Sequence, residues 1–381
     1  MHDRDDRYRR DAFTWTAFGA LFAFGYVNAV LGPSLPYIRS VEGISYVVAA
    51  LHQVAFALGG GIAGLLSTRD RIPWSRRTVV AAGLSGAALA GLAVGYGNAA
   101  PVTIVAALLM GLCATLALIR VWAALADAHG HRRAVAMSEG EIAVSLAGIS
   151  TPLIIGVVAG TGATWRFTFV IGAVTMAAAV LGLLRTEVPR PRYGVRETHR
   201  RARIRPTLVI VFAIVGLEFA LSFWLASYLN TSVGLTRNTA VALVSVLYAA
   251  NLVGRVLASR FSRSQPAERV LIGALVLVLL GLPFLLSATS APVAVVGIVL
   301  AGAGIGALFP LTSAIHVQAT GGTADNALGE ILFVAAPGQM LGPLVAGVVA
   351  QLAGLRLGLL VLPALTVVAG AGLAAHRRGV G

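Results

Sequence analysis

The chain has 381 residues, of which 57% are hydrophobic and 12% are charged, and its formal net charge at pH 7 is +14. Its mean hydropathy of +0.85 excludes an ordinary water-soluble domain, because too few polar side chains are available to face water. The single cysteine, Cys113, excludes an intramolecular disulfide. The sequence shows no metal-ligand cluster, so we expect neither a metal nor a cofactor.

Twelve apolar stretches are each long enough to cross about 30 Å of hydrocarbon as a helix. In chain order they span residues 13–37, 45–67, 78–98, 101–126, 136–159, 166–185, 207–229, 239–261, 269–288, 292–316, 326–351 and 354–375. The first is too long for the apolar region of a signal peptide and lacks an A-x-A-like cleavage site, so we expect it to remain as a helix. The sequence therefore predicts an all-α membrane protein with twelve transmembrane helices.

The second half of the chain repeats the first at a constant offset of 191 residues, so that Gly25 corresponds to Gly216 and Tyr37 to Tyr228. Each half holds six of the apolar stretches. Because six is an even number, both halves enter and leave the membrane on the same side, and the repeat is parallel. We predict an N-terminal six-helix bundle over residues 1–185, a basic linker over 186–205 and a C-terminal six-helix bundle over 206–381.

All 29 basic residues are arginines, and their distribution over the loops predicts the orientation in the membrane. On the side of the N-terminus lie 24 of them, against four on the opposite side and Arg120 within a span. The positive-inside rule therefore predicts a multi-pass protein of the inner (plasma) membrane with both termini in the cytoplasm. Since this pattern explains the charge, we expect no nucleic-acid partner, and we interpret the linker as a tether that contacts lipid headgroups rather than a regulatory site.

Several short motifs resemble those of the major facilitator superfamily. Asp70 to Arg77 is similar to the family's G-x-x-x-D-R-x-G-R-R loop, although Gly64 lies two residues too far upstream and two residues are inserted before the arginine pair. An echo of this loop occurs at Gly254 to Arg260, and the glycine-proline pattern of helices five and eleven occurs at Gly148 to Pro152 and Gly338 to Pro343. The resemblance covers the whole chain and implies two pseudo-symmetric six-helix bundles that move solutes.

Two further strings resemble fucose-permease-like members of that superfamily. They are the glycine and aromatic pattern from Gly216 to Tyr228 and the string from Gly304 to Pro310. This resemblance favours symport of a sugar-like or related neutral compound.

Carboxylates inside apolar spans are expensive, at about 2.5–3.5 kcal/mol on insertion scales, and therefore mark candidate functional sites. Glu218 lies near the middle of the seventh span with Ser222 one turn later on the same face. We predict that Glu218 is a proton or cation site in a central cavity, and the alternative is a structural hydrogen bond between helices. Glu141 shares a face with Ser145 and Gly148, which fits a position either in the cavity or at a helix interface.

Other polar residues of the spans are candidate contacts for a substrate. Tyr248 and Asn251 belong to a polar stripe on one face of the eighth span, where they either contact substrate or hold helices together. His52 is a weaker candidate, because a lone histidine in an apolar helix is more often a hydrogen-bonded packing residue. The remaining candidates are Tyr26, Asn28, Gln53, Thr312, Ser313 and Gln339.

The resemblance to the superfamily also implies a gate at the cytoplasmic side. There, helices five and eleven face helices eight and two, which would bring Glu139 near Arg255 or Arg260. The same arrangement would bring Glu330 near Arg71, Arg76 or Arg77, and Asp70 of the same loop also belongs to the predicted gate. We predict two symmetry-related salt-bridge latches, and the alternative is that both glutamates stabilise the first turn of their helices through the helix dipole.

The sequence contains no Walker motif, and no set of nucleophile, base and acid converges at one depth, so we expect neither ATP hydrolysis nor an enzyme. We predict a monomeric secondary active transporter that moves a small organic solute by alternating access, with protons as the coupling ion. Efflux of a drug or metabolite by proton antiport is the alternative to uptake by symport. Rivals from another class are a polytopic membrane enzyme and a sensor built on a transporter fold.

Overall fold

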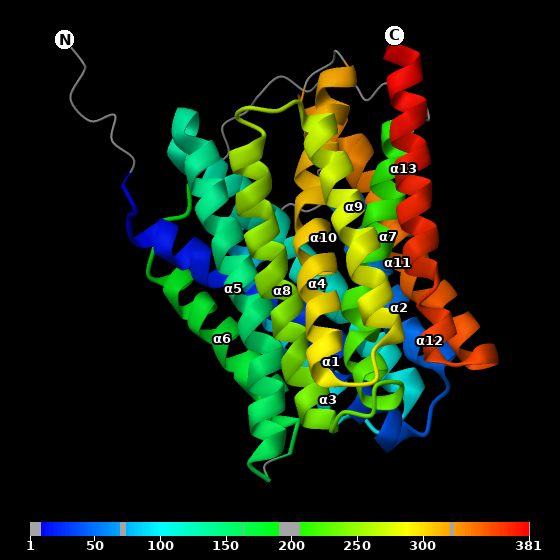
Figure 1. The fold of residues 1–381 in the computed structure, drawn as a ribbon. Coiled ribbons are helices and arrows are strands. Elements are labelled where there is room, and N and C mark those ends of the chain that lie inside the picture. Colours follow the sequence, from blue (N-terminus) through cyan, green and yellow to red (C-terminus); the bar gives the residue numbers. More distant parts are fainter. Residues whose placement is uncertain (1–8, 69–73, 163, 190–205, 321–323, 381) are drawn as a thin grey trace.

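The computed structural model describes residues 9–68, 74–162, 164–189, 206–320 and 324–380 as a bundle of long helices (Figure 1). Both termini lie at the same end of the bundle, at the top of Figure 1. We call this end the terminal face and the other end the distal face. Within the described residues, twelve helical segments are long and apolar enough to cross a membrane, which confirms the predicted number.

The helices follow the predicted apolar stretches closely but extend beyond several of them. Their bounds are α1 (Ala12–Glu42), α2 (Tyr46–Thr68), α3 (Arg76–Tyr96), α4 (Ala100–His129), η1 (Gly130–Arg132), α5 (Arg133–Gly160), α6 (Phe167–Leu184), α7 (Pro206–Thr231), α8 (Arg237–Phe261), α9 (Ala267–Ser287), α10 (Ala291–Thr320), α11 (Ala324–Ala353), α12 (Leu355–Gly358) and α13 (Val361–Val380). The twelfth span consists of the short α12 followed by α13. Capping by polar side chains, such as Asp11 on the amide of Thr14, extends helices past the apolar stretch.

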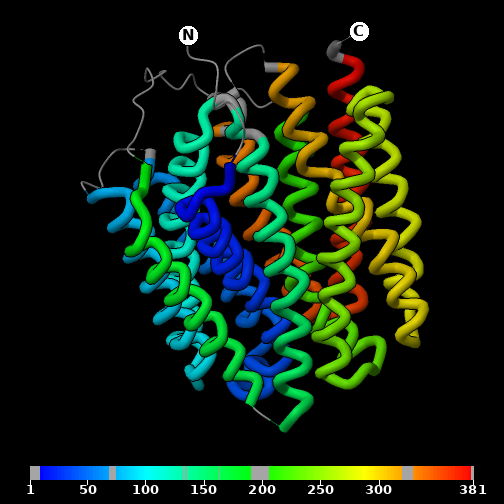
Figure 2. The backbone as a smooth tube through the Cα atoms, turned by 90° about the vertical axis from the view of Figure 1, so that its left-hand side faces the viewer, coloured from blue at the N-terminus to red at the C-terminus, as the bar shows by residue number. Residues whose placement is uncertain are grey.

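The helices form two groups that meet mainly along three pairs of helices. In the first group α1 packs against α5 and α6, and α4 packs against α2 and α3; in the second group α7 packs against α11 and α13, and α10 packs against α8 and α9. Contact between the groups runs along α5 with α8, α2 with α11 and α1 with α7. Figure 2 shows the two groups side by side from a second direction. The predicted boundary at 186–205 remains a proposal, since residues 190–205 lie outside the described part.

Helices α1 and α7 are the most enclosed helices, and glycine allows them to approach each other closely. Gly25 packs against Val144 of α5, and Gly32 packs against Ser222 and Phe223 of α7. A Cβ atom at Gly32 would lie 2.7 Å from the carbonyl oxygen of Ser222, so that no larger residue fits without displacing a backbone. The crossing of α1 and α7 therefore depends on this glycine.

Replacing Gly32 with valine should destabilise the contact between the two bundles by about 1–3 kcal/mol, the usual cost of overpacking. Gly19→Val is the matched control, because nothing lies within 4 Å of a Cβ atom at Gly19 in the same helix. Both variants replace a glycine with valine inside the same helix, so the change in intrinsic helix propensity is the same. The difference between their unfolding midpoints therefore reports the steric clash at position 32. Thermal unfolding of the purified proteins measures it, and equal unfolding midpoints for the two variants would contradict the proposed contact.

The bundles touch mainly in their distal halves. On one side, Gly156 and Gly160 of α5 pack against Asn238 and Ala242 at the start of α8. On the other side, Gly347 of α11 packs against the first residues of α2 and against Trp224 of α7. We refer to these contacts together as the distal seam. The glutamates expected to close the terminal face bind partners within their own bundles, as described below.

Candidate functional site

The accessible side chains of the two enclosed helices mark a space inside the molecule. From Ala213 to Leu229, α7 is buried except at Glu218, Phe219 and Ser222, which keep part of their surface accessible. On α1, Asn28 is half-buried and lies between Gly25, which packs on α5, and Gly32, which packs on α7. Since protein surrounds α7, its accessible side chains must open into a space between the helices rather than to the outer surface.

Three charged side chains from both bundles gather at this space. Arg255 of α8 lies 3.5 Å from Glu141 of α5, measured from Nη1 to Oε2, and this ion pair connects the bundles. Glu218 of α7 lies within electrostatic range of both partners. The Glu141 side chain is 54% exposed although neighbouring helices surround it, which indicates that the space admits water. We call Glu141, Glu218 and Arg255 the central cluster.

Tyr248 and Ser222 complete the polar surroundings of the central cluster. The ring of Tyr248 packs against Gly148 of α5, where a Cβ atom would lie 3.0 Å from Cδ1. Its hydroxyl lies near Glu218 and shares a hydrogen bond with Ser222. The structure therefore brings together five residues that the sequence singled out on three different helices.

The ion pair between Arg255 and Glu141 is weak enough for Arg255 to exchange one carboxylate partner for another. Its N–O distance of 3.5 Å is long for a charge-assisted hydrogen bond, and both side chains are at least 36% exposed. Pairs of this kind contribute about 0–1 kcal/mol. Arg255 can therefore change partners between Glu141 in the other bundle and Glu218 in its own at little cost.

A family model for the Major Facilitator Superfamily matches residues 17–335 of the chain. The chain belongs to the major facilitator superfamily. Membership makes it a membrane transporter and not an enzyme. No curated protein matches the chain by sequence.

Solved structures of major facilitator transporters share the fold at low sequence identity. A bacterial homologue of the human lysosomal transporter Spinster, inward-facing and unoccupied, is 16% identical with a TM-score of 0.75, and the alignment covers 97% of this chain and 98% of that one. A D-xylose-proton symporter is 16% identical with a TM-score of 0.74, covering 95% and 96%. A variant of the nucleoside transporter NupG is 13% identical with a TM-score of 0.76, covering 96% and 100%. These likenesses show the fold alone.

Three of the predicted substrate contacts lie within the packing of this major facilitator fold instead of at the central space. Tyr26 is buried, and its hydroxyl donates to the carbonyl of Thr168 on α6 at 2.8 Å. Asn251 is buried as well; with its amide nitrogen turned toward the carbonyls, it donates to Gly302 at 2.7 Å and Leu247 at 3.2 Å. Its role is the alternative considered above, which is to hold α8 against α10.

The third of these residues, His52, is fully buried between α2 and α4. Its Nε2 atom lies 2.9 Å from the hydroxyl of Thr103, and its Nδ1 atom lies 3.2 Å from the carbonyl of Ala49. Two apolar helices thus enclose the ring of His52, and its place in a substrate cavity stays a prediction. Gln53 and Thr312 are also buried, Ser313 has an enclosed hydroxyl, and Gln339 is half-buried on α11.

The glutamates of the predicted latches bind partners in their own bundles in this structure. Glu139 accepts two hydrogen bonds from Arg10, at 2.8 Å from Nε and 2.6 Å from Nη2. Glu330 lies 3.1 Å from Nε2 of His316, which is buried in the same bundle. Both of these ion pairs lie within one bundle, and the described bundle contacts lie mainly at the other face. The latches remain a proposal for the opposite state of the transporter.

Two arginines of the predicted gate, Arg76 and Arg77, also bind partners within the first bundle. Arg76 binds Asp127 of α4 at 2.7 Å, and Arg77 donates to the carbonyl of Leu184. Arg260 is exposed at the end of α8. Asp70 and Arg71 lie outside the described residues.

Sequence reasoning missed the residues that join the bundles at the distal seam. The Tyr37 hydroxyl donates to Oδ1 of Asn238 at 2.6 Å, and Arg237 lies over the Tyr37 ring at 5.2 Å. On the other side, the backbone amide of Tyr46 donates to Oε1 of Gln351 at 3.0 Å, and its ring packs on Trp224. Aromatic residues at helix ends are usually attributed to the membrane interface, which hides such contacts in a sequence. An arginine lies over each of the two tyrosine rings, and this pairing was the available signal for contacts at the distal seam.

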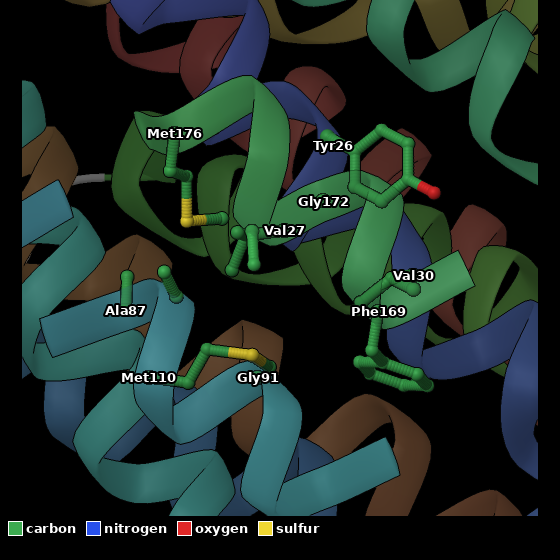
Figure 3. Close-up of a pocket in the computed structure, with 11 residues that line it drawn as sticks. Tyr26, Val27, Val30, Ala87, Gly91, Met110, Phe169, Gly172 and Met176 are labelled. Carbon is green, nitrogen blue, oxygen red and sulfur yellow. The ribbon is translucent and has the colours of Figure 1, made fainter. Parts of the chain in front are cut away.

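A small apolar pocket lies elsewhere, inside the first bundle (Figure 3). Its lining comes from α1, α3, α4 and α6 and includes Val27, Met110, Phe169 and Met176. The pocket offers no polar group except at its edge, where the hydroxyl of Tyr26 is already bonded to Thr168. We assign it to packing, because small apolar voids of this kind stay dry.

Proposed function

We propose that the protein is a proton-coupled secondary active transporter that moves a small organic solute by alternating access. The observation that supports it is the central cluster, which brings two carboxylates and one guanidinium from both bundles together at the space between the helices. Such groups are retained inside a membrane protein when they carry ions, protons or substrate. Glu218 is the proposed proton carrier, and Glu141 is its partner across the space.

The proposed coupling depends on whether Arg255 pairs with Glu218 or with Glu141. While Glu218 is ionised, it draws Arg255 toward its own bundle and weakens the pair with Glu141. A proton on Glu218 removes this competition, so that Arg255 turns to Glu141 and pulls α8 toward α5. Loading and unloading of one proton therefore changes an attraction between the bundles, which alternating access requires.

The orientation of the transporter follows from the arginine distribution. With 24 of 29 arginines on the side of the termini, the terminal face is the cytoplasmic one. Because the bundles meet at the distal seam, we interpret the structure as open toward the cytoplasm. The protein then belongs to the inner (plasma) membrane, and we propose that it works as a monomer because the central cluster is complete within one chain.

The charge of the central cluster restricts the cargo. Two carboxylates against one guanidinium leave an excess of one negative charge when all three are ionised. An anionic cargo would face this charge without compensation, whereas a neutral or monovalent cationic solute fits. A cation would compete with the proton for the same carboxylates, which favours exchange by antiport as the second candidate. A neutral cargo favours symport.

Transport by reconstituted protein tests the proposal. Metabolites and drugs that raise the unfolding temperature are first selected at two pH values and then offered to proteoliposomes with an imposed pH gradient. We expect the gradient to drive solute flux and the flux to move protons, which a trapped pH-sensitive dye reports. Glu187→Gln, an exposed position beyond α6, is the matched control and should behave as wild type. Solute flux that no pH gradient accelerates would contradict proton coupling.

A further inference from the structure

A second set of titratable groups lies far from the central cluster, at the distal end of the first bundle. Thr103 of α4 is fully buried, and its Oγ1 atom lies 2.9 Å from Oε1 of Glu42 at the end of α1. The same oxygen lies 2.9 Å from Nε2 of His52 on α2. One hydroxyl thus connects a carboxyl group and an imidazole from two other helices.

When Glu42 is ionised and His52 is neutral, the three side chains have too few polar hydrogens to place one in each of their close contacts. If the proton of His52 is on Nδ1, it serves the Ala49 carbonyl. The single hydrogen of the Thr103 hydroxyl then goes to Nε2 of His52 or to the carbonyls of Ala99 and Ala100 in its own helix, and in either case its oxygen faces the Glu42 carboxylate with no hydrogen between them. If the proton is on Nε2 instead, Thr103 can donate to Glu42, but Nδ1 faces the Ala49 carbonyl as a second acceptor. Each tautomer leaves one acceptor opposite another acceptor.

One additional proton removes the conflict. A doubly protonated His52 donates to Ala49 and to Thr103, and Thr103 donates to Glu42. Equally, a protonated Glu42 donates to Thr103, and Thr103 donates to His52. We propose that Glu42, Thr103 and His52 form a proton-binding site that is separate from the central cluster and takes up its proton from the distal side.

Accessibility shows where the proton enters. His52 and Thr103 have no accessible surface, while Glu42 is half-buried in the last turn of α1, next to Gly43 and the turn that leads to α2. The second oxygen of Glu42, Oε2, is buried without a hydrogen-bond partner. Glu42 therefore connects the enclosed pair to the distal face.

The neighbouring charges keep their state throughout the pH range in which this site titrates. Arg166, which precedes α6 and binds the carbonyl of Tyr96 and the side chain of Asn98, acts on Glu42 from outside the set. Arg39 of α1 lies over the ring of Tyr46, with 3.6 Å between its Cζ atom and the ring centroid. Both arginines stay charged, so that the pH response belongs to Glu42 and His52.

The site holds the turn between α1 and α2, and this turn carries one side of the distal seam. Tyr46 begins α2, packs on Trp224 of the other bundle and binds Gln351 through its backbone amide. With the proton bound, α1 and α2 are both tied to α4 through Thr103, and Tyr46 is held in place. Loss of the proton puts two acceptors face to face and loosens the turn. Protons on the distal side thus keep the distal seam closed.

Distances across the distal seam test the proposal. Spin labels at Thr161 and Thr231, both exposed at the distal face, are introduced into a Cys113→Ala background and measured by double electron–electron resonance in nanodiscs. In the full-length protein, we expect the population with long distances to rise at least about twofold from about pH 5 to about pH 8, the range in which histidine titrates. The same rise should persist in Glu218→Gln, because the site does not use the central cluster.

Three variants of the site separate its chemistry from its packing. Thr103→Val has nearly the same shape but no hydroxyl, and we expect it to abolish the pH response, while Thr103→Ser should restore it. Glu42→Gln can donate to Thr103 as a protonated carboxyl does, and it should keep the seam closed at every pH. A full response in Thr103→Val, or its loss in Glu218→Gln, would overturn the proposal. Thermal unfolding midpoints close to that of the wild type in Thr103→Val and Glu42→Gln show that the fold is intact.

Discussion

Glu218→Gln should favour closure between α5 and α8 on the terminal side of the central cluster, and Glu141→Gln should favour opening. Glutamine at 218 no longer competes for Arg255, which then pairs with Glu141 across the bundles at all times. Glutamine at 141 leaves Arg255 to Glu218 in its own bundle. Because the pair is worth up to about 1 kcal/mol, each substitution should shift the two populations roughly two- to fivefold, in opposite directions.

Spin labels at Arg133 and Ser259 report this change, since both are exposed at the terminal ends of the two helices that Arg255 and Glu141 connect. The distance distributions of both variants are compared with the wild type at one pH and again after acidification. Acid should shift the wild type toward the distribution of Glu218→Gln, and it should shift Glu218→Gln itself less, because only the site at Glu42 then still responds to pH. A shift of both variants in the same direction would rule out the exchange of partners by Arg255.

The same substitution should also abolish proton coupling. Glu218→Gln cannot release a proton, so that a pH gradient should no longer drive accumulation of the solute, while exchange of the solute across the membrane continues. Glu187→Gln serves again as the unaffected control. Loss of exchange together with loss of accumulation would instead place Glu218 in binding of the cargo itself.

The fold was predictable because a membrane enforces strong patterns on a sequence. Twelve apolar stretches and an internal repeat were sufficient to predict the number and type of the spans, and the resemblance supplied the superfamily. Helix ends were less predictable. Asp11 begins α1 by capping, and Gly43 ends it in the left-handed conformation, so that α1 runs past the apolar stretch to Glu42. Local polar chemistry, not hydropathy, sets these ends.

For the candidate site, the sequence carried a strong signal only at ionisable residues, and their role stays a prediction. Glu218 and Glu141 are too costly in a membrane to be incidental, and both lie at the central space. Neutral polar residues gave no such signal, because their side chains can donate hydrogen bonds to backbone carbonyls of neighbouring helices, as those of Asn251 and Tyr26 do. Which carbonyl lies within reach depends on the packing of two helices, and a single sequence does not contain that information. The latches also stay a prediction, because they belong to the state in which the terminal face is closed.

Charge should decide which solutes bind at the central cluster. Tetraphenylphosphonium and tetraphenylborate have nearly the same shape and opposite charges, so that their difference in affinity reports the potential of the site. We expect purified protein to bind the cation at least about tenfold more tightly than the anion, since unit charges about 4 Å apart near a protein surface interact by several kcal/mol. Acid should weaken binding of the cation, because a proton competes for the same carboxylates.

Variants of the central cluster sharpen this prediction because they shift cation affinity in opposite directions. Glu218→Gln and Glu141→Gln each remove one negative charge and should weaken binding of tetraphenylphosphonium about tenfold or more. Arg255→Gln removes the guanidinium that competes with tetraphenylphosphonium for the carboxylates. This variant should therefore bind tetraphenylphosphonium more tightly, although residue 255 lies at the same space. Weaker binding in all three variants would indicate that the cluster shapes the site without attracting the charge. Unchanged binding in all three would place the cation elsewhere on the protein.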